Sequence, residues 1–141
     1  MKYKCGYTTG VFDLFHVGHL ELLRKAKSNC SYLIVGVSSD DLVFQVKKRR
    51  PIIPCSERMK ILAAIRYVDK VVEQTSIEKL ADWEKYHFDV VFHGDDWKNS
   101  EIDLYNARVL KDKNVDFVYF DRGEFLSTTQ IRKKIIKEKG E

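Results

Sequence analysis

The chain has 141 residues, and 25 lysines and arginines against 21 aspartates and glutamates give a net charge of +4. This length is typical of one domain, and 44% hydrophobic with 33% charged residues supports a packed core and argues against intrinsic disorder. No apolar run approaches the roughly 20 residues of a membrane-spanning helix, and no signal-peptide pattern is present, so we expect one cytoplasmic domain over residues 1–141 with no membrane partner.

Short apolar runs alternate with amphipathic segments along the whole chain. The expected strands are 4–9, 32–38, 70–74, 89–93 and 116–121, several of them rich in the β-branched and aromatic residues that favour strands. The expected helices are 18–28, 56–67, 76–87 and 102–113, followed by a last helix from Ser127, where Ser-Thr-Thr-Gln is typical of a capping box. Residues 46–55 are basic and contain both prolines, which predicts a mobile loop before a helix capped by Ser56.

The second expected strand contains Tyr-Leu-Ile-Val-Gly-Val at 32–37, which is almost continuously apolar. Parallel strands covered by helices on both faces have this pattern. The alternation of strands and helices therefore predicts a doubly wound, Rossmann-like α/β fold with a parallel sheet of about five strands. Because ligands bind at the carboxyl ends of such strands, residues that directly follow strands are the candidates for a site.

The cysteines and the distribution of charge limit the kinds of site that the chain can form. The three cysteines (Cys5, Cys30 and Cys55) are far apart and form no C-x-x-C pair, which favours free thiols over a disulfide framework or a thiolate zinc site. Positive charge is concentrated at 47–50 and in the C-terminal tail. A solvated surface is the ordinary explanation of such clusters, and a phosphate-bearing ligand is the alternative. Charge alone does not separate a nucleotide from a nucleic acid.

The first expected strand ends in Thr-Thr-Gly-Val-Phe-Asp-Leu-Phe-His-Val-Gly-His at 8–19. Gly10 allows the backbone to turn close to a ligand, and Gly18 marks a helix start, where free amides and the helix dipole favour an anion. His16 and His19 bracket that start, so both rings can face one phosphate. A zinc site is disfavoured because no third ligand follows at a familiar spacing.

The segment from Gly10 to His19 resembles the G-x-F-D-x-x-H-x-G-H signature of the cytidylyltransferases in the HxGH nucleotidyltransferase superfamily, matching all six fixed positions. The likeness continues at 32–40, 56–58, 66–69, 93–97 (His-Gly-Asp-Asp-Trp) and 127–129 (Ser-Thr-Thr), and it is greatest to bacterial members that act on glycerol 3-phosphate. It implies an enzyme that moves CMP from CTP to a small alcohol phosphate, for which glycerol 3-phosphate is the best candidate, with release of pyrophosphate. It also implies Mg²⁺ that arrives with the nucleotide rather than at a dedicated protein site, and a homodimer that makes precursors of a cell-surface polymer.

The resemblance also assigns roles to residues. His16 and His19 are expected to stabilise the transition state at the α-phosphorus, and Lys47 is expected to bind the phosphates, with Lys48 left open by a one-residue difference in loop length. Arg122 is expected to be catalytic and to bind the acceptor. The expected nucleotide-binding residues are Thr9, Gly10, Val11, Phe12, Asp13, Gly94, Asp95, Trp97, Ser127 and Thr128. The expected acceptor-binding residues are Arg58, Asp96 and Arg122.

Two alternatives remain open from the sequence. One is an adenylyltransferase of the same superfamily that uses ATP on another phosphorylated acceptor, because two histidines do not distinguish the bases. The other is a non-catalytic nucleotide- or nucleic-acid-binding module that uses the basic residues 47–50, although no groove-reading motif accompanies them, so we expect no nucleic-acid partner. The acceptor is open as well, since Phe125 occupies a position where the relatives tend to have glycine.

Overall fold

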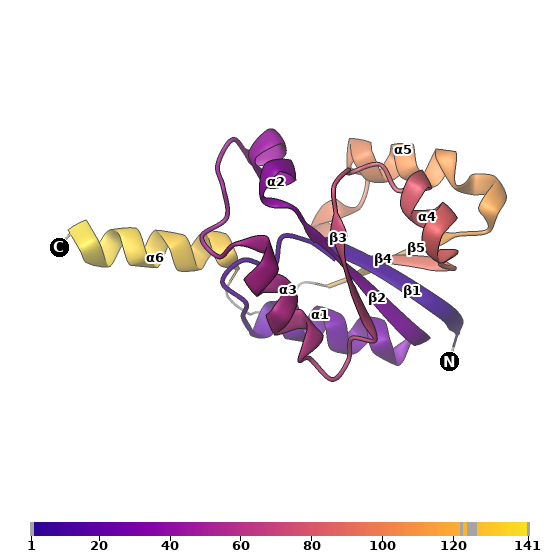
Figure 1. The fold of residues 1–141 in the computed structure, drawn as a ribbon, viewed down its shortest axis with the longest axis horizontal. Coiled ribbons are helices and arrows are strands. Elements are labelled where there is room, and N and C mark those ends of the chain that lie inside the picture. The colour runs from indigo at the N-terminus through magenta and orange to yellow at the C-terminus, as the bar shows by residue number, and fades with distance from the viewer. Residues whose placement is uncertain (1, 122, 124–126, 141) are drawn as a thin grey trace.

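The computed structural model describes residues 2–121, 123 and 127–140. These residues form a parallel sheet of five strands in the order β3-β2-β1-β4-β5 (Figure 1). The strands are β1 (Tyr3–Gly10), β2 (Cys30–Ser38), β3 (Lys70–Gln74), β4 (Val90–Gly94) and β5 (Asp116–Phe120). The Rossmann-like α/β prediction is confirmed, and the predicted strand 70–74 coincides with β3.

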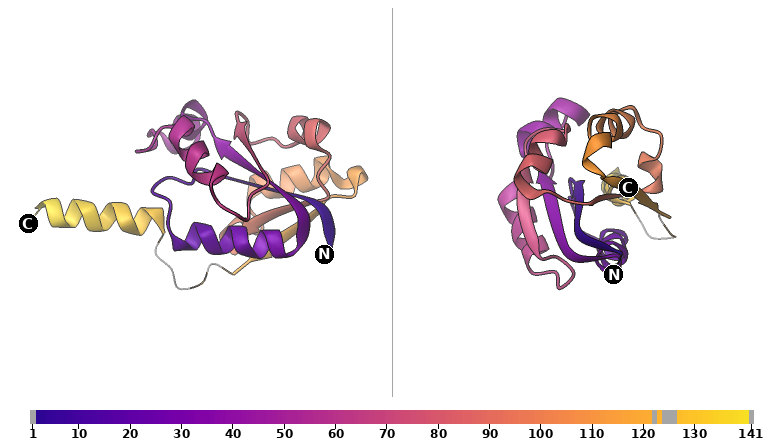
Figure 2. Two further views of the ribbon diagram at one scale, coloured as in Figure 1. Left: turned by 60° about the horizontal axis from the view of Figure 1, so that its bottom comes forward. Right: turned by 90° about the vertical axis from the view of Figure 1, so that its right-hand side faces the viewer.

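Helices cover both faces of this sheet (Figure 2). The helices of the chain are α1 (Val17–Ser28), α2 (Asp40–Lys47), α3 (Cys55–Ala63), α4 (Leu80–Tyr86), α5 (Glu101–Val109) and α6 (Thr128–Gly140), of which α6 does not lie on the sheet, and there are short 3₁₀ turns η1 (Asp95–Trp97) and η2 (Lys111–Lys113). Apolar side chains of α1 and α3 pack in one core, which includes Leu23 and Leu62. The second core lies on the other face, where Leu80 and Trp83 of α4 pack with Tyr7.

The position of β1 in the sheet creates the place for a site. β1 pairs with β2 along its whole length, from Tyr3 opposite Cys30 to Gly10 opposite Val37. On its other side β1 pairs with β4 through Gly6 and Tyr7. The strand order therefore reverses between β1 and β4, and doubly wound sheets bind ligands in the crevice at the carboxyl ends of such strands.

The structure departs from the predicted helices in one helix that was not predicted and in several helix boundaries. Residues 40–47 form α2, which we did not predict, although Ser39 caps it by accepting a hydrogen bond from Leu42 N–H at 3.1 Å. Helix α3 begins at Cys55 after the N-cap residue Pro54, so Ser56 is not the cap. The Cys55 N–H instead donates to the carboxylate of Asp40 at 3.1 Å. Helix α4 begins at Leu80, four residues later than predicted.

The last helix, α6, extends away from the body of the molecule (Figures 1 and 2). Its capping box is confirmed, because Gln130 N–H donates to Ser127 Oγ at 3.1 Å and Ser127 N–H donates to Gln130 Oε1 at 2.8 Å. Among the described residues, none of the helices has the length and apolar character needed to cross a membrane.

Candidate active site

A cavity of about 620 Å³ lies at the carboxyl ends of the strands. Its walls come from the segment after β1, from α2 and the residues that follow it, from η1 and from the first turns of α6. Most of the residues expected at the site line it, namely Thr9, Gly10, Val11, Phe12, Asp13, His16, His19, Lys47, Gly94, Asp96, Trp97, Ser127 and Thr128. The structure thus brings together segments that lie more than a hundred residues apart.

His16 and His19 form a reciprocal cap at the start of α1. Nδ1 of His16 accepts a hydrogen bond from Gly18 N–H at 3.1 Å, and Nδ1 of His19 accepts one from His16 N–H at 3.2 Å. The two rings stack with centroids 3.8 Å apart. Because each Nδ1 is an acceptor, the proton of each neutral ring lies on Nε2. The helix start therefore presents imidazole N–H groups, because the Gly18 and His16 amides are engaged by the histidine rings themselves.

The environment of His19 keeps its ring neutral. Burial lowers the pKa of His19 to about 3, and the neighbouring His16 acts in the same direction, while Asp13 acts against them. Phe12 and Phe15 contribute to this burial with ring centroids 5.4 Å and 5.3 Å from that of His19. At neutral pH His19 is consequently a hydrogen-bond donor through Nε2 rather than a cation.

Helix α6 is joined to this histidine pair through Thr128. The Thr128 hydroxyl donates to the carbonyl oxygen of Asp13 at 2.9 Å, and Nε2 of His16 lies 3.3 Å from the same hydroxyl oxygen. Since the hydroxyl proton is used on Asp13, His16 Nε2–H is the donor in the second contact. This assignment agrees with the tautomer that the helix cap requires.

Asp13 lies at the edge of the cavity, but its carboxylate is already occupied. It is 2% exposed and accepts hydrogen bonds from the backbone N–H groups of Ile52 and Ile53 at 2.8 Å and 2.9 Å. It also forms an ion pair with Arg132 of α6 at 2.6 Å. Asp13 therefore holds the segment after α2 and the last helix against β1, and the sequence analysis did not identify Arg132 or this bracing role.

The cavity wall near Asp13 carries a cationic group of Lys47, Arg49 and Arg132. Burial lowers the pKa of Lys47, and the nearby guanidinium groups of Arg49 and Arg132 add to that effect, while Asp13 opposes it. Three positive charges near the single carboxylate of Asp13 favour the binding of an anion. Lys48 does not line the cavity and instead ends α2 with a left-handed backbone at φ 60°. The geometry thus favours Lys47 over Lys48 as the phosphate lysine.

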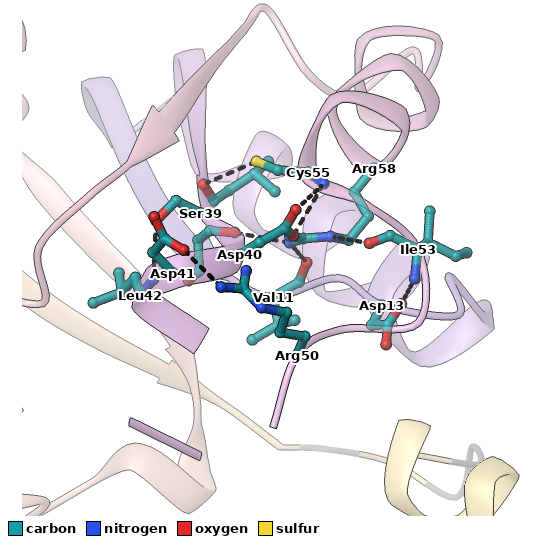
Figure 3. Close-up of polar contacts among 12 residues, drawn as sticks. Val11, Asp13, Ser39, Asp40, Asp41, Leu42, Arg50, Ile53, Cys55 and Arg58 are labelled. Atoms are coloured by element: carbon teal, nitrogen blue, oxygen red, sulfur yellow. Dashed lines mark hydrogen bonds and ion pairs between the residues drawn. The ribbon is translucent and has the colours of Figure 1, made fainter. Parts of the chain in front are cut away.

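The position of Arg58 differs from the acceptor-binding role expected from the sequence. Its side chain is fully buried outside the cavity lining, and its guanidinium is used within the chain (Figure 3). It donates to the carbonyl oxygens of Ile53, Val11 and Ser38 at 2.7 Å, 2.7 Å and 2.9 Å, and it pairs with Asp40 at 2.6 Å. Arg58 therefore ties α3 to the ends of β1 and β2, and its guanidinium is not placed in the cavity where an acceptor would bind.

Of the remaining expected residues, one does not line the cavity and one is not described by the structure. Asp95 does not line it, although Gly94, Asp96 and Trp97 on either side do. Gly94 leaves room for its neighbour, because a Cβ there would lie 2.7 Å from Asp96 Oδ1. Arg122 lies outside the described residues, so its expected role stays a prediction.

A buried polar cluster behind Trp97 was also missed. His93 Nδ1 and the Tyr119 hydroxyl both contact Asp103 Oδ2 at 2.9 Å, and His93 Nε2 lies 3.2 Å from the Thr9 hydroxyl. Burial lowers the pKa of His93, so Nδ1–H donates to Asp103 and Nε2 accepts from Thr9. His93 also stacks on Trp97 at 4.9 Å. The cluster therefore fixes two residues of the cavity wall, and the position of His93 near the end of β4 was the available signal.

Three more wall residues have buried polar side chains that sequence reasoning did not select. They are Ser38, Gln74 and Lys79. Ser38 and Gln74 each end a strand, so the rule that ligands bind at strand ends includes them. Lys79 precedes α4, and no local pattern distinguishes it from the other lysines of the chain.

Comparison with known proteins gives a consistent result. Residues 7–134 match the family described as cytidylyltransferase-like. The chain is 39% identical over 129 residues to glycerol-3-phosphate cytidylyltransferase of Staphylococcus aureus, covering 91% of this chain and 92% of that protein. It is equally similar to the protein of that name from Bacillus subtilis, covering 91% and 94%. The crystal structure of a lipopolysaccharide core biosynthesis protein from Thermoplasma volcanium shares the fold, with a TM-score of 0.70 at 22% identity over 84% of this chain and 99% of that one.

Proposed function

Because the chain belongs to the cytidylyltransferase-like family, we propose that it transfers CMP from CTP to the phosphate of glycerol 3-phosphate, giving CDP-glycerol and pyrophosphate. The observation that carries the proposal is the pair of imidazoles at the start of α1, which lines the cavity directly beyond β1. The named relatives, which match this chain over most of their own length, support the choice of substrates.

The proposed reaction is an in-line displacement at phosphorus. A phosphate oxygen of glycerol 3-phosphate attacks the α-phosphorus of CTP, and the bond from that phosphorus to the bridging oxygen of the β-phosphate breaks. Pyrophosphate leaves with the electron pair. No general base is required, because the second pKa of a phosphomonoester is about 6 and the nucleophile is already ionised at neutral pH. The protein has to align two anions that repel each other.

The wall of the cavity has the donors that this displacement requires. Nε2–H of His19 can bind the α-phosphoryl oxygens, where negative charge grows in the transition state, and the positive end of the α1 dipole favours the same charge. Lys47, Arg49 and Arg132 supply positive charge for the β- and γ-phosphates that become pyrophosphate. In the substrate complex, we expect nucleotide phosphates between α1 and α6 and the base near Gly94 and Trp97.

We propose that Mg²⁺ accompanies the triphosphate. Magnesium keeps several waters and is commonly held through substrate phosphates with one or two carboxylates. The Asp13 carboxylate is already engaged by Ile52, Ile53 and Arg132, and the phosphate end of the cavity is cationic, so the ion would be held by the nucleotide phosphates and water rather than by these residues. When bound, the ion would neutralise charge on the leaving pyrophosphate.

A cytoplasmic homodimer is part of the same proposal, and light scattering of the purified protein measures the oligomeric state.

A pyrophosphate-release assay tests the proposal. Each nucleoside triphosphate is combined with glycerol 3-phosphate, ethanolamine phosphate, choline phosphate and several sugar phosphates. We expect the highest kcat/KM for CTP with glycerol 3-phosphate. Preference for ATP would replace the proposal with an adenylyltransferase, and nucleotide binding without release in any combination would indicate a non-catalytic module.

A further inference from the structure

Thr9 lines the cavity, and its hydroxyl proton is used inside the protein. The hydroxyl oxygen lies 3.2 Å from Nε2 of His93. Because His93 donates through Nδ1 to Asp103 at 2.9 Å, its Nε2 is an acceptor and the Thr9 hydroxyl is the donor. In the part of the chain that the structure describes, this hydroxyl has no second hydrogen-bond partner. A ligand in the cavity therefore meets the Thr9 oxygen as a hydrogen-bond acceptor.

Buried groups on both sides of Thr9 hold its hydroxyl in this orientation. His93 and Asp103 are 3% and 2% exposed, and the Tyr119 hydroxyl donates to the same Asp103 oxygen as His93 does. A carboxylate oxygen has no proton to give, so the His93 ring keeps its proton on Nδ1. On the side of β2, a Cβ on Gly36 would lie 3.0 Å from the Thr9 methyl carbon Cγ2. The methyl group thus faces β2 and the hydroxyl faces β4.

Several other side-chain acceptors in the wall are engaged within the protein. The Asp13 carboxylate accepts two backbone N–H groups and pairs with Arg132, Gln74 Oε1 accepts from the Ser38 hydroxyl, and Ser127 Oγ accepts a backbone N–H. A ligand hydroxyl that leaves water on binding needs an acceptor in its place, because an unpaired buried donor is costly. Thr9 offers one that is fixed before the ligand arrives.

The position of Thr9 favours the acceptor substrate over the nucleotide as the source of that hydroxyl. Side chains alternate along a strand, so Thr9 points to the same face of the sheet as Tyr7, which packs with α4. The triphosphate is expected at the histidine pair of α1, on the other face, and an in-line acceptor approaches from the side opposite the leaving pyrophosphate. The base is expected near Trp97, which packs on the face of the His93 ring, whereas Thr9 contacts the edge of that ring.

Resting on the proposed function, we propose that the Thr9 side chain, oriented by His93 and Asp103, accepts a hydrogen bond from a hydroxyl of the acceptor and selects alcohol phosphates that carry that hydroxyl. Thr9 is then a specificity-determining residue that touches the substrate. His93 and Asp103 are positioning residues, because they act on the substrate only through Thr9. This side-chain contact is additional to the nucleotide-binding role expected for Thr9 from the sequence.

Acceptor analogues that lack a hydroxyl test this inference. Glycerol 3-phosphate is compared with 3-hydroxypropyl phosphate, 2-hydroxypropyl phosphate and propyl phosphate, in the wild type and in Thr9→Val. In the wild type, removal of the hydroxyl that Thr9 binds should lower kcat/KM about tenfold. In Thr9→Val the same removal should change kcat/KM less than about twofold, because the protein acceptor is gone. Each ratio compares two substrates of one enzyme sample, so it does not depend on the folded fraction.

Thr8→Val is the matched control. Thr8 is the neighbouring threonine, but it is fully buried, does not line the cavity and donates to the carbonyl oxygen of Phe92 at 2.7 Å. Thr8→Val should keep the wild-type ratio between acceptors even where it lowers the Tm.

His93→Phe tests the positioning role. The substitution keeps a ring against Trp97 and removes the acceptor of the Thr9 proton, so the Thr9 hydroxyl is free to rotate. The ratio between acceptors should fall without disappearing, and the double variant with Thr9→Val should match Thr9→Val alone. A purely structural role of His93 would lower the Tm and leave the ratio at its wild-type value.

Three results would overturn the inference while CDP-glycerol formation leaves the proposed function standing. One is equal use of glycerol 3-phosphate and propyl phosphate by the wild type, and another is an unchanged ratio in Thr9→Val. The third is a loss of the preference for CTP over UTP in Thr9→Val with the acceptor ratio unchanged, which would assign the contact to the amino group of the base. If the wild type releases no pyrophosphate from CTP with any of these acceptors, the proposed function fails and the inference fails with it.

Discussion

The backbone N–H of His16 donates to Nδ1 of His19 across 3.2 Å, and the two rings stack at 3.8 Å. This contact places the proton of neutral His19 on Nε2 and leaves that N–H to a ligand. The catalytic role proposed for His19 is therefore separable from its capping role, because the two nitrogens would perform different tasks.

Substitutions at His19 make this separation measurable. Asparagine keeps an acceptor near the position of Nδ1 and removes the Nε2 donor, so His19→Asn should lower kcat by about 10² to 10³, as for an oxyanion-hole donor. Glutamine can place an amide N–H near Nε2, so His19→Gln should lose less. CTP affinity should change far less than kcat in both variants. His16→Ala should also lower kcat more than affinity, and near-wild-type turnover at both positions would contradict the assignment.

The same histidine predicts how stability depends on pH. The pKa of folded His19 is about 3, against an ordinary value of 6.5, so the unfolded chain binds the proton first as pH falls. The free energy of unfolding should therefore decrease between about pH 6.5 and pH 3, and it should not change through this group above that range. Urea denaturation across the range measures the slope. His19→Gln should reduce it, with the part due to His93 remaining, and equal slopes in both proteins would contradict the burial of His19.

Arg58→Met tests the correction made at the acceptor site. The substitution removes the guanidinium donor from Asp40 and from three carbonyl oxygens, and leaves Asp40 with the Cys55 N–H as its remaining partner among the described residues. Breaking a buried ion pair costs about 3–5 kcal/mol, and we expect the lower end because the Asp40 side chain is 33% exposed. Urea denaturation should show this loss, while the folded fraction keeps the wild-type KM for the acceptor. Unchanged stability with a raised acceptor KM would restore the role first expected from the sequence.

Lys47 and Lys48 give a test that uses neighbouring residues as a matched pair. Lys47 lines the cavity beside Arg49 and Arg132, whereas Lys48 ends α2 and does not line the cavity. Lys47→Ala should raise the KM for CTP and lower kcat, and Lys48→Ala should change both less. Steady-state kinetics with varied CTP measures both values. The reverse order of severity would move the phosphate contact by one residue.

Local patterns in the sequence predicted the sheet, most helices and the two histidines, because these depend on periodicity, strand ends and helix starts. They did not predict Arg58, whose burial depends on a carbonyl 47 residues away at Val11 and a carboxylate 18 residues away at Asp40. The missed helix α2 had a visible signal in Ser39, which is followed by two aspartates in the first turn. The sequence analysis assigns the end of α2, in the basic run at 47–50, to a loop.

Local sequence patterns also fail to identify Lys79 and Arg132 as residues of the cavity wall. The chain has 25 lysines and arginines. A charged residue in or next to a helix is ordinarily exposed to solvent, so the sequence does not distinguish these two from the others. Lys79 becomes a wall residue only through the packing of α4 against the sheet and the hydrogen bond from its backbone to Asn106 on α5. Arg132 does so only because Asp13 lies 119 residues earlier and within 2.6 Å in space. The positions of Lys79 and Arg132 in the wall therefore depend on tertiary contacts, which no local residue spacing predicts.

Hydrogen exchange along residues 46–55 provides the last prediction. The sequence alone predicts a loop that is poorly ordered without a ligand, but Asp13 accepts hydrogen bonds from Ile52 and Ile53 N–H. These two amides should exchange slowly even in the free protein, and Asp13→Asn should accelerate them because its amide NH₂ cannot accept both bonds.

Arg49 has no such anchor among the described residues and lines the cavity, so amides near it should exchange fast in the free protein and slow on addition of CTP with Mg²⁺. The triphosphate would draw Arg49 and Lys47 together and offset the mutual repulsion that they have with Arg132. ATP should protect the segment less if contacts to the base contribute. Equal protection by ATP would favour an adenylyltransferase, and no protection by either nucleotide would leave the cationic group as a solvated surface.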